Sequence, residues 1–208
     1  MTRTSHKRWR SLQRFNYIFE IGLYIICSLC LVFFAVKGIY AKCFQAALII
    51  SVLLIMRGLT KWTRTRLSSG LRFSILLFIT ITMLLAKLFN MYSVIPHLDK
   101  IEHLLSGAIL VYVGLLIHDK TIQRHPERHL HQPGAIWFAL FFSVAMAGVW
   151  EIYEFTVDHL FGLVSQNGSL TDTMWDIICG TAGAIIIVVF LSFKVIKDPQ
   201  YILRTDEA

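Results

Sequence analysis

Apolar residues along the chain fall into long runs that are separated by shorter polar stretches. Six runs reach or approach the roughly 20 residues that a transmembrane helix needs. They cover about residues 17–36, 41–56, 73–92, 101–118, 135–157 and 174–193. Runs of this length are too long for ordinary strands, so they predict helices. The pattern predicts an all-α fold: a polytopic transmembrane bundle of about six helices, with residues 1–208 as a single integral membrane domain.

The composition agrees with this pattern and narrows the class of protein. Of the 208 residues, 56% are hydrophobic and 16% are charged. A soluble domain is about 45–50% apolar and about 25% charged. The six runs take up more than half of the chain, so no sizeable soluble domain is left over.

The positive charges are unevenly distributed among the connections. Of the 20 Lys and Arg residues, sixteen lie in the two tails and in the second and fourth connections. Two lie in the first connection, Lys37 and Lys42, one lies in the third, Lys100, and the fifth has none; the last, Lys87, lies inside a helix. Cytoplasmic loops carry an excess of Lys and Arg, so both termini are predicted to be cytoplasmic. Topology and contact with anionic membrane lipid then explain the net charge of +7, and nucleic-acid binding is not expected.

Ionisable residues inside the predicted helices gather near the outer face of the membrane. At 1.5 Å per residue, Glu151 lies roughly 24 Å from the inner edge of a core about 30 Å thick, and Lys87 lies roughly 22 Å along its own helix. The fourth and sixth runs begin at the same face. Pairs spaced to share one helix face are Asp99 with His103, Glu151 with Glu154, and Asp172 with Asp176.

Charged groups in a membrane helix are costly, so they usually face the protein interior or a wet cavity. We therefore expect Glu151 and Glu154 to meet His103, Asp176 and Lys87 in a pocket open to the outside. Trp150 and Tyr153 fit the pocket wall or the outer aromatic belt. No comparable cluster is expected near the inner face. The small-residue run that contains Gly180 and Gly183 predicts close packing of the sixth helix against the fourth or fifth.

Carboxylates with a histidine suit divalent cations such as Mg, Mn or Zn. The candidate metal ligands are His103, Glu151, Glu154, Asp172 and Asp176. The candidate catalytic residues are His103, Glu151, Glu154 and Asp176. Further candidates for ligand binding are Lys87, Asp99, Asp172, Trp150 and Tyr153.

Three functions remain open for this cluster. The first is a metal-dependent hydrolase or transferase, in which the metal activates water and His103 acts as a ligand or general acid/base. Its substrate would be lipid-linked or part of the cell envelope. The second is a transporter or binding protein for a small molecule, ion or proton. The third is a non-catalytic scaffold in which the acids hold the helices together. The sequence also leaves open whether the chain forms a homo-oligomer.

Three blocks of sequence resemble a known group of proteins. They are DKIEHLLSG (99–107), WEIYEF (150–155) and DTMWDIICGTAGA (172–184). They resemble the uncharacterised bacterial membrane proteins of the YjdF-like family and the wider VanZ-like group. Glu154 and Asp176 stand where VanZ-like chains carry glutamine and asparagine, and these added acids favour the YjdF-like family. The resemblance implies a multi-pass protein of the bacterial inner or cytoplasmic membrane. The VanZ-like group is associated with resistance to a glycopeptide that acts on the cell wall, which suggests an envelope substrate by analogy.

Overall fold

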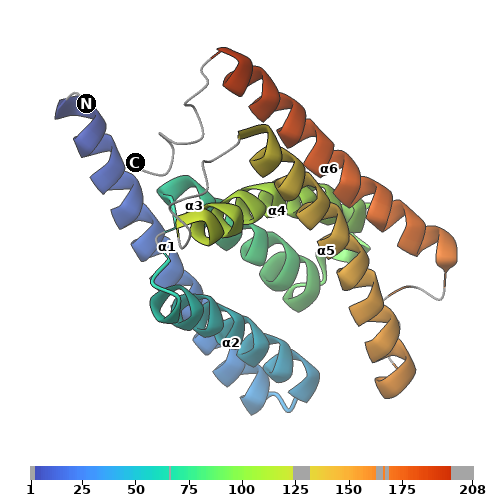
Figure 1. The fold of residues 1–208 in the computed structure, drawn as a ribbon. Helices are drawn as coiled ribbons and strands as arrows, with labels where there is room; N and C mark the ends of the chain where they lie inside the picture. The colour runs from blue at the N-terminus through green and yellow to red at the C-terminus, as the bar shows by residue number, and fades with distance from the viewer. Residues whose placement is uncertain (1–2, 66, 124–131, 163–165, 167–168, 198–208) are drawn as a thin grey trace. The chain divides into compact units, whose positions relative to one another are not determined.

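The computed structural model describes residues 3–65, 67–123, 132–162, 166 and 169–197, and the regular elements in these ranges are all helices, with no strand. The helices are α1 (Arg3–Val36), α2 (Tyr40–Trp62), α3 (Ser69–Ile79), the π-helix η1 (Thr80–Leu88), the short 3₁₀-helix η2 (Met91–Ser93), α4 (Leu98–Gln123), α5 (Gln132–Phe161) and α6 (Leu170–Lys197) (Figure 1). Helix α3 continues directly into η1, and the two form one span.

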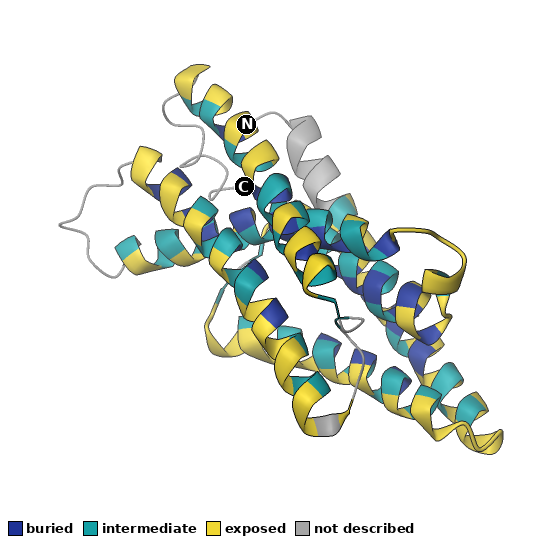
Figure 2. Cartoon of the chain, turned by 90° about the vertical axis from the view of Figure 1, so that its right-hand side faces the viewer, coloured by how far each residue is buried: buried dark blue, intermediate teal, exposed yellow. Residues whose placement is uncertain are grey.

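Six spans among the described residues are long and apolar enough to cross a membrane. Many large apolar side chains are exposed, among them Leu29, Leu54 and Ile186. Figure 2 shows exposed positions along the helices. Such exposure would be unusual in a soluble protein and suits contact with lipid. The predicted all-α fold with six transmembrane helices is therefore confirmed. The helices extend beyond most of the predicted apolar runs because polar residues continue them at the ends.

The third span differs from the prediction, which continued it as a regular helix to residue 92. It becomes a π-helix at Thr80 and ends at Leu88. The hydroxyls of Thr80 and Thr82 donate to the carbonyls of Leu76 and Phe78, four residues earlier, and such bonds compete with the regular helical ladder. Asn90 then adopts a left-handed conformation with φ of 58°, which ends the helix.

The side chain of Lys42 closes the end of this π-helix. Its Nζ donates to the carbonyl oxygens of Lys87 at 3.0 Å and Leu88 at 2.7 Å. The last carbonyls of a helix have no partner within it, so a cation there supplies both hydrogen bonds and a favourable charge. Lys42, near the start of α2, thereby ties α2 to η1.

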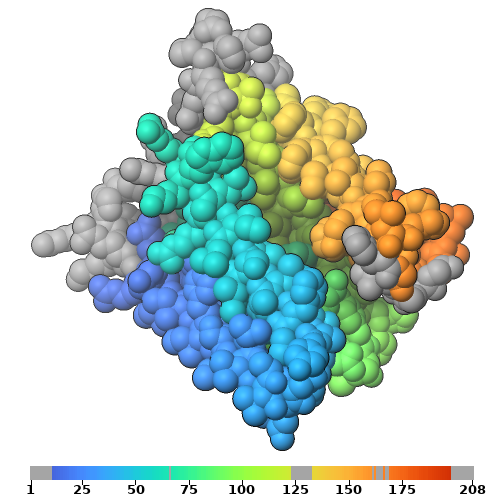
Figure 3. All heavy atoms as spheres, turned by 90° about the horizontal axis from the view of Figure 1, so that it is seen from below, coloured from blue at the N-terminus to red at the C-terminus, as the bar shows by residue number. Residues whose placement is uncertain are grey.

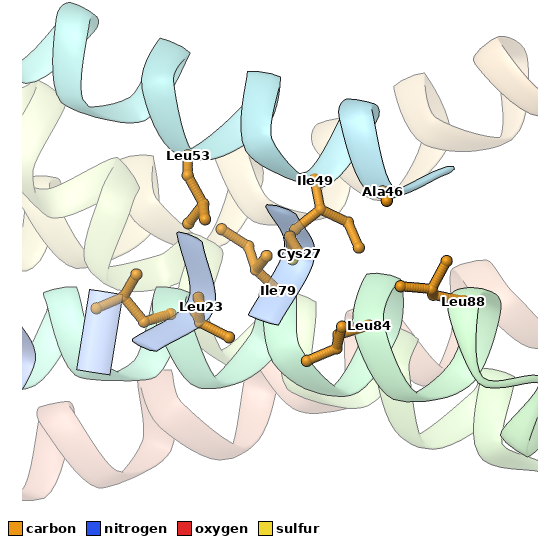
Figure 4. Packing of buried hydrophobic residues seen from close by; sticks show 9 residues of the cluster. Leu23, Cys27, Ala46, Ile49, Leu53, Ile79, Leu84 and Leu88 are labelled. Atoms are coloured by element: carbon orange, nitrogen blue, oxygen red, sulfur yellow. The ribbon is translucent and has the colours of Figure 1, made fainter. Parts of the chain in front are cut away.

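Contacts between residues divide the chain into two compact units, Met1–Leu98 and Asp99–Ala208. The organisation of residues 1–208 as one domain stays a prediction. In the first unit, α1 and α2 lie side by side, and their surfaces adjoin in Figure 3. Its core joins α1, α2, α3 and η1. Figure 4 shows side chains from these helices that point toward one another: Leu23, Cys27, Ala46, Ile49, Leu53, Ile79, Leu84 and Leu88.

The first unit also holds a buried charged group that the sequence interpretation did not anticipate. Glu20 on α1 is 1% exposed and forms an ion pair with Arg72 on α3. Arg57 Nη1 on α2 lies 3.8 Å from Glu20 Oε1. One turn earlier, Asn16 donates to the carbonyl of Ser69 at 2.7 Å. This group has one acid and two arginines, so it differs from the expected cluster of several acids and a histidine, and the expectation for the inner face stays a prediction.

Glycines bring the helices of the second unit into close contact. A Cβ atom on Gly107 of α4 would overlap the carbonyl of Gly180 on α6, and one on Gly183 would overlap the carbonyl of Leu104. Ser143 Oγ on α5 donates to the carbonyl of Gly107 at 2.9 Å. The predicted close packing of α6 through Gly180 and Gly183 is confirmed. It brings the beginning of α6 beside the beginning of α4.

Candidate metal centre

A cluster of charged side chains lies where α4 and α6 begin. Lys100 is at its centre. Its Nζ donates to Asp172 Oδ1 and to Asp176 Oδ1, each at 2.6 Å, and reaches Asp99 Oδ2 at 3.3 Å. All of these residues belong to the second unit. Three carboxylates thus surround one ammonium group, so the cluster holds more acidic than basic groups.

His103 lies one helical turn after Asp99 and faces the same carboxylates. Its Nε2 is 3.6 Å from Asp99 Oδ1 and 3.7 Å from Asp176 Oδ1. These separations are too long for good hydrogen bonds. They are suitable for atoms that share a cation between them. His103 is 8% exposed and Asp176 is 3% exposed, so the cluster is shielded on the side of the helices.

Asp99, His103 and Asp176 fit the ligand set of a divalent metal ion. One ligand atom from each of the three lies within 4.8 Å of the other two, and this is a metal-compatible group among the described residues. One imidazole nitrogen with two carboxylate oxygens suits Zn or Mn, whose bonds to such atoms are about 2.0–2.2 Å long. Asp176 Oδ1 already accepts from Lys100, so a bound metal and Lys100 would compete for this oxygen.

Local sequence explains why the acids gather at these helix starts. Asp99 lies in the first turn of α4 and Asp172 in the first turn of α6. The partial positive charge at a helix N-terminus stabilises carboxylates there. Ser169 Oγ accepts a hydrogen bond from the backbone N–H of Asp172 at 3.3 Å, which caps the start of α6. The same bond fixes Asp172 opposite Lys100.

The two glutamates on α5 make their contacts elsewhere. Glu151 is 4% exposed, and Gln166 Nε2 donates to its carbonyl oxygen at 3.2 Å and to its Oε2 at 3.4 Å. Glu154 is only half-buried and accepts from Trp150 Nε1 at 3.0 Å. Trp150 and Tyr153 are exposed, with ring centroids 5.3 Å apart. The roles predicted for these four residues in ligand binding or catalysis stay predictions.

Lys87 belongs to the first unit, where its side chain is exposed on η1. Its predicted approach to the acidic cluster stays a prediction.

Lys100 and Gln166 are the contacts that sequence reasoning missed. Lys100 was treated as a loop charge because it lies at a predicted helix boundary. Its spacing of three residues before His103 could have placed it on the same face of α4. Gln166 lies in the connection between α5 and α6, where helical periodicity gives no information on the direction of a side chain.

Comparison with known proteins adds a family but no reaction. Residues 19–197 match the family described as predicted membrane protein (DUF2238). A protein of Thermotoga maritima named only as uncharacterised is 30% identical over 99 residues, which are 48% of this chain and 50% of that protein. The chain therefore spans about half the length of that relative. No solved structure matches the chain. The match over residues 19–197 shows that the chain belongs to the DUF2238 family of predicted membrane proteins.

Proposed function

We propose that this multi-pass membrane protein binds one divalent metal ion through Asp99, His103 and Asp176. The ion would serve a hydrolase or transferase reaction on a lipid-linked or cell-envelope substrate. The observation that carries the proposal is the approach of three potential ligand atoms, from two helices, to within 4.8 Å of one another. Two of the three residues are buried, although isolated charges in a membrane helix are costly.

The position of the cluster supports an amphipathic substrate. Asp99 and Asp172 lie in the first turns of helices that are long and apolar enough to span the membrane, so the cluster lies toward one end of the spans. A lipid headgroup would reach this level while its chains stayed among the apolar helices. The charge asymmetry of the connections supports cytoplasmic termini and an outward-facing cluster. The motif resemblance to YjdF-like and VanZ-like proteins supports a bacterial cell membrane.

Each residue of the cluster has a distinct role in this proposal. Asp99, His103 and Asp176 hold the metal, which polarises a phosphoryl or carbonyl oxygen or activates water. Asp172 holds Lys100, whose ammonium group is 2.6 Å away, so that Lys100 can turn toward an anionic group of the substrate. Glu151 and Glu154 are not among the proposed ligands, because their contacts are with Gln166 and Trp150.

The test is metal stoichiometry in purified protein. Isothermal titration with Mn²⁺ or Zn²⁺ should give one site per chain in the wild type. His103→Gln and Asp176→Asn should each lose the site while the protein remains folded by circular dichroism. Glu154→Gln is a matched control on a neighbouring acid and should bind as the wild type does. Failure of the wild type to bind, or equal binding in all four proteins, would contradict the proposal.

The reaction is tested separately from the metal. Metal-loaded protein in detergent is incubated with a mixture of phospholipids and lipid-linked phosphates, and products are followed by mass spectrometry. Turnover that disappears in Asp176→Asn supports a hydrolase or transferase. Metal binding without turnover, combined with metal or proton flux in sealed vesicles, would instead identify a carrier.

A further inference from the structure

A second polar site lies in the same unit, in a groove between α5 and α6. The groove has a volume of about 860 Å³, and Ile152, Phe155 and Leu170 contribute apolar walls. This volume is within the usual range for small-molecule sites, about 300–1,000 Å³. We call it the α5–α6 groove, after the helices that supply most of its lining. The residues of the proposed metal centre do not line it.

The charge of the groove is negative. Glu151 and Asp158 line it together with His159, and none of the lining residues is Lys or Arg. Asp158 Oδ2 accepts from the backbone N–H of Gln166 at 3.0 Å. That bond fixes the backbone of Gln166, whose side-chain amide reaches Glu151.

Glu151 is the unexplained member of this group. It is 4% exposed, and its Oε1 has no hydrogen-bond partner among the residues that the structure describes. Its only side-chain hydrogen bond among those that the structure gives is the long contact of 3.4 Å from Gln166 Nε2 to Oε2. A buried carboxylate oxygen without a donor is costly, and the cost is removed when a ligand supplies N–H or O–H groups.

We propose that the α5–α6 groove binds a molecule with a protonated primary amine and an apolar body. The ammonium group would donate to Glu151, and the apolar body would lie against Ile152, Phe155 and Leu170. An anion is disfavoured by the two carboxylates. A purely apolar occupant would leave Glu151 Oε1 without a donor. A metal ion is disfavoured because, among the described residues, Glu151 is not one of three His, Cys, Asp or Glu side chains whose ligand atoms lie close enough together to share an ion.

Such an amine has two sources in a membrane. One is the headgroup of an aminophospholipid, and the other is a free hydrophobic amine. Both would place the same ammonium group against Glu151, and they are separated by the lipid arm of the experiment.

The probe for the free amine is dodecylamine, compared with dodecanol, in protein purified in a neutral detergent. Binding is measured by isothermal titration. We expect dodecylamine to bind at one site per chain and dodecanol to bind at least tenfold more weakly, because charge-assisted hydrogen bonds are about twice as strong as neutral ones. Glu151→Gln should weaken dodecylamine binding roughly tenfold or more. Glu154→Gln, one turn along α5 and outside the groove lining, should leave it unchanged.

A second variant tests the proposal even if Glu151→Gln does not fold. Gly148 lines the groove, and a Cβ atom there would meet nothing within 4 Å. Gly148→Leu should therefore occupy the part of the groove next to Glu151, one helical turn away, without disturbing the helix, and should abolish dodecylamine binding. Binding of the amine in Gly148→Leu, equal binding of amine and alcohol, or no amine binding by the wild type would each overturn the proposal.

The lipid arm uses native mass spectrometry of protein released from nanodiscs that contain equal amounts of phosphatidylethanolamine and phosphatidylcholine. Selective retention of phosphatidylethanolamine, lost in Gly148→Leu, identifies the lipid headgroup as the amine. Dodecylamine binding without such selectivity identifies a free amine. Glu151→Gln and Gly148→Leu should both leave metal binding unchanged. Failure of the amine proposal can therefore be distinguished from failure of the metal proposal.

Discussion

Replacement of Lys100 by glutamine should increase the metal affinity of the cluster. In the wild type, Lys100 Nζ lies 2.6 Å from Asp176 Oδ1, an oxygen that the proposed metal needs. A metal ion that binds there must displace or share this hydrogen bond. Lys100→Gln removes both the competitor and its positive charge, while glutamine retains a side chain of similar length.

The size of the effect follows from the bond that is lost. A hydrogen bond to a charged group contributes about 1.5–3 kcal/mol. Each 1.4 kcal/mol corresponds to a tenfold change in affinity. The Lys100 side chain is 21% exposed, so solvent screens this interaction only in part. Lys100→Gln should therefore bind Mn²⁺ roughly 10- to 100-fold more tightly than the wild type.

The assay is isothermal titration with Mn²⁺ at fixed pH and ionic strength. Thermal unfolding provides a second readout: without metal, Lys100→Gln should melt below the wild type, because its carboxylates lose their ammonium partner. Added Mn²⁺ should raise its melting temperature more than that of the wild type. Lys37→Gln is the control, because Lys37 is exposed in the connection between α1 and α2.

Unchanged or weaker Mn²⁺ affinity in Lys100→Gln would refute the competition between lysine and metal. The double variant Lys100→Gln/Asp176→Asn distinguishes the site of the gain. It should bind no better than Asp176→Asn alone, because the carboxylate that Lys100 would release is then replaced by a neutral amide.

Three further predictions concern the packing that holds the helices together. Gly107→Ala should lower the free energy of unfolding by about 1–3 kcal/mol in detergent, because the added methyl overlaps the Gly180 carbonyl. The control Gly22→Ala has open space around the added methyl and should not lower it. An equal loss in both variants would contradict this reasoning. Glu20→Gln should lower the free energy of unfolding by about 1–3 kcal/mol in the same assay, because the ion pair with Arg72 is lost. An unchanged melting curve would show that the pair contributes nothing to stability. Lys42→Met should speed hydrogen exchange at the end of η1, where two carbonyls lose their donor, and unchanged exchange there would argue against the capping role.

The helical fold follows from features that a sequence displays directly. Long apolar runs fix both the number of spans and their helical state, because a chain in lipid must satisfy its backbone internally. The π-helix did not follow, because its end is closed by Lys42, which lies far away in sequence, and because the Thr80 and Thr82 hydroxyls make bonds that also occur in the regular helices of this chain.

Only part of the candidate site could be predicted from the spacing of residues in the sequence. Spacing of three or four residues correctly grouped Asp99 with His103 and Asp172 with Asp176. It gave no information on Gln166, whose amide lies against Glu151, and the predicted approach of Glu151 to Asp176 stays a prediction. Glu20 was missed because its arginine partners, Arg57 and Arg72, were counted as loop charges for topology.

The most direct test of the proposed metal centre is pulsed electron paramagnetic resonance of the Mn²⁺-loaded protein. The ¹⁴N modulation of the signal reports nitrogen ligands within the first coordination sphere. The wild type should show coupling to one histidine nitrogen, and His103→Gln should lose this coupling. A wild-type signal without ¹⁴N coupling, or coupling that persists in His103→Gln, would contradict a metal held by Asp99, His103 and Asp176.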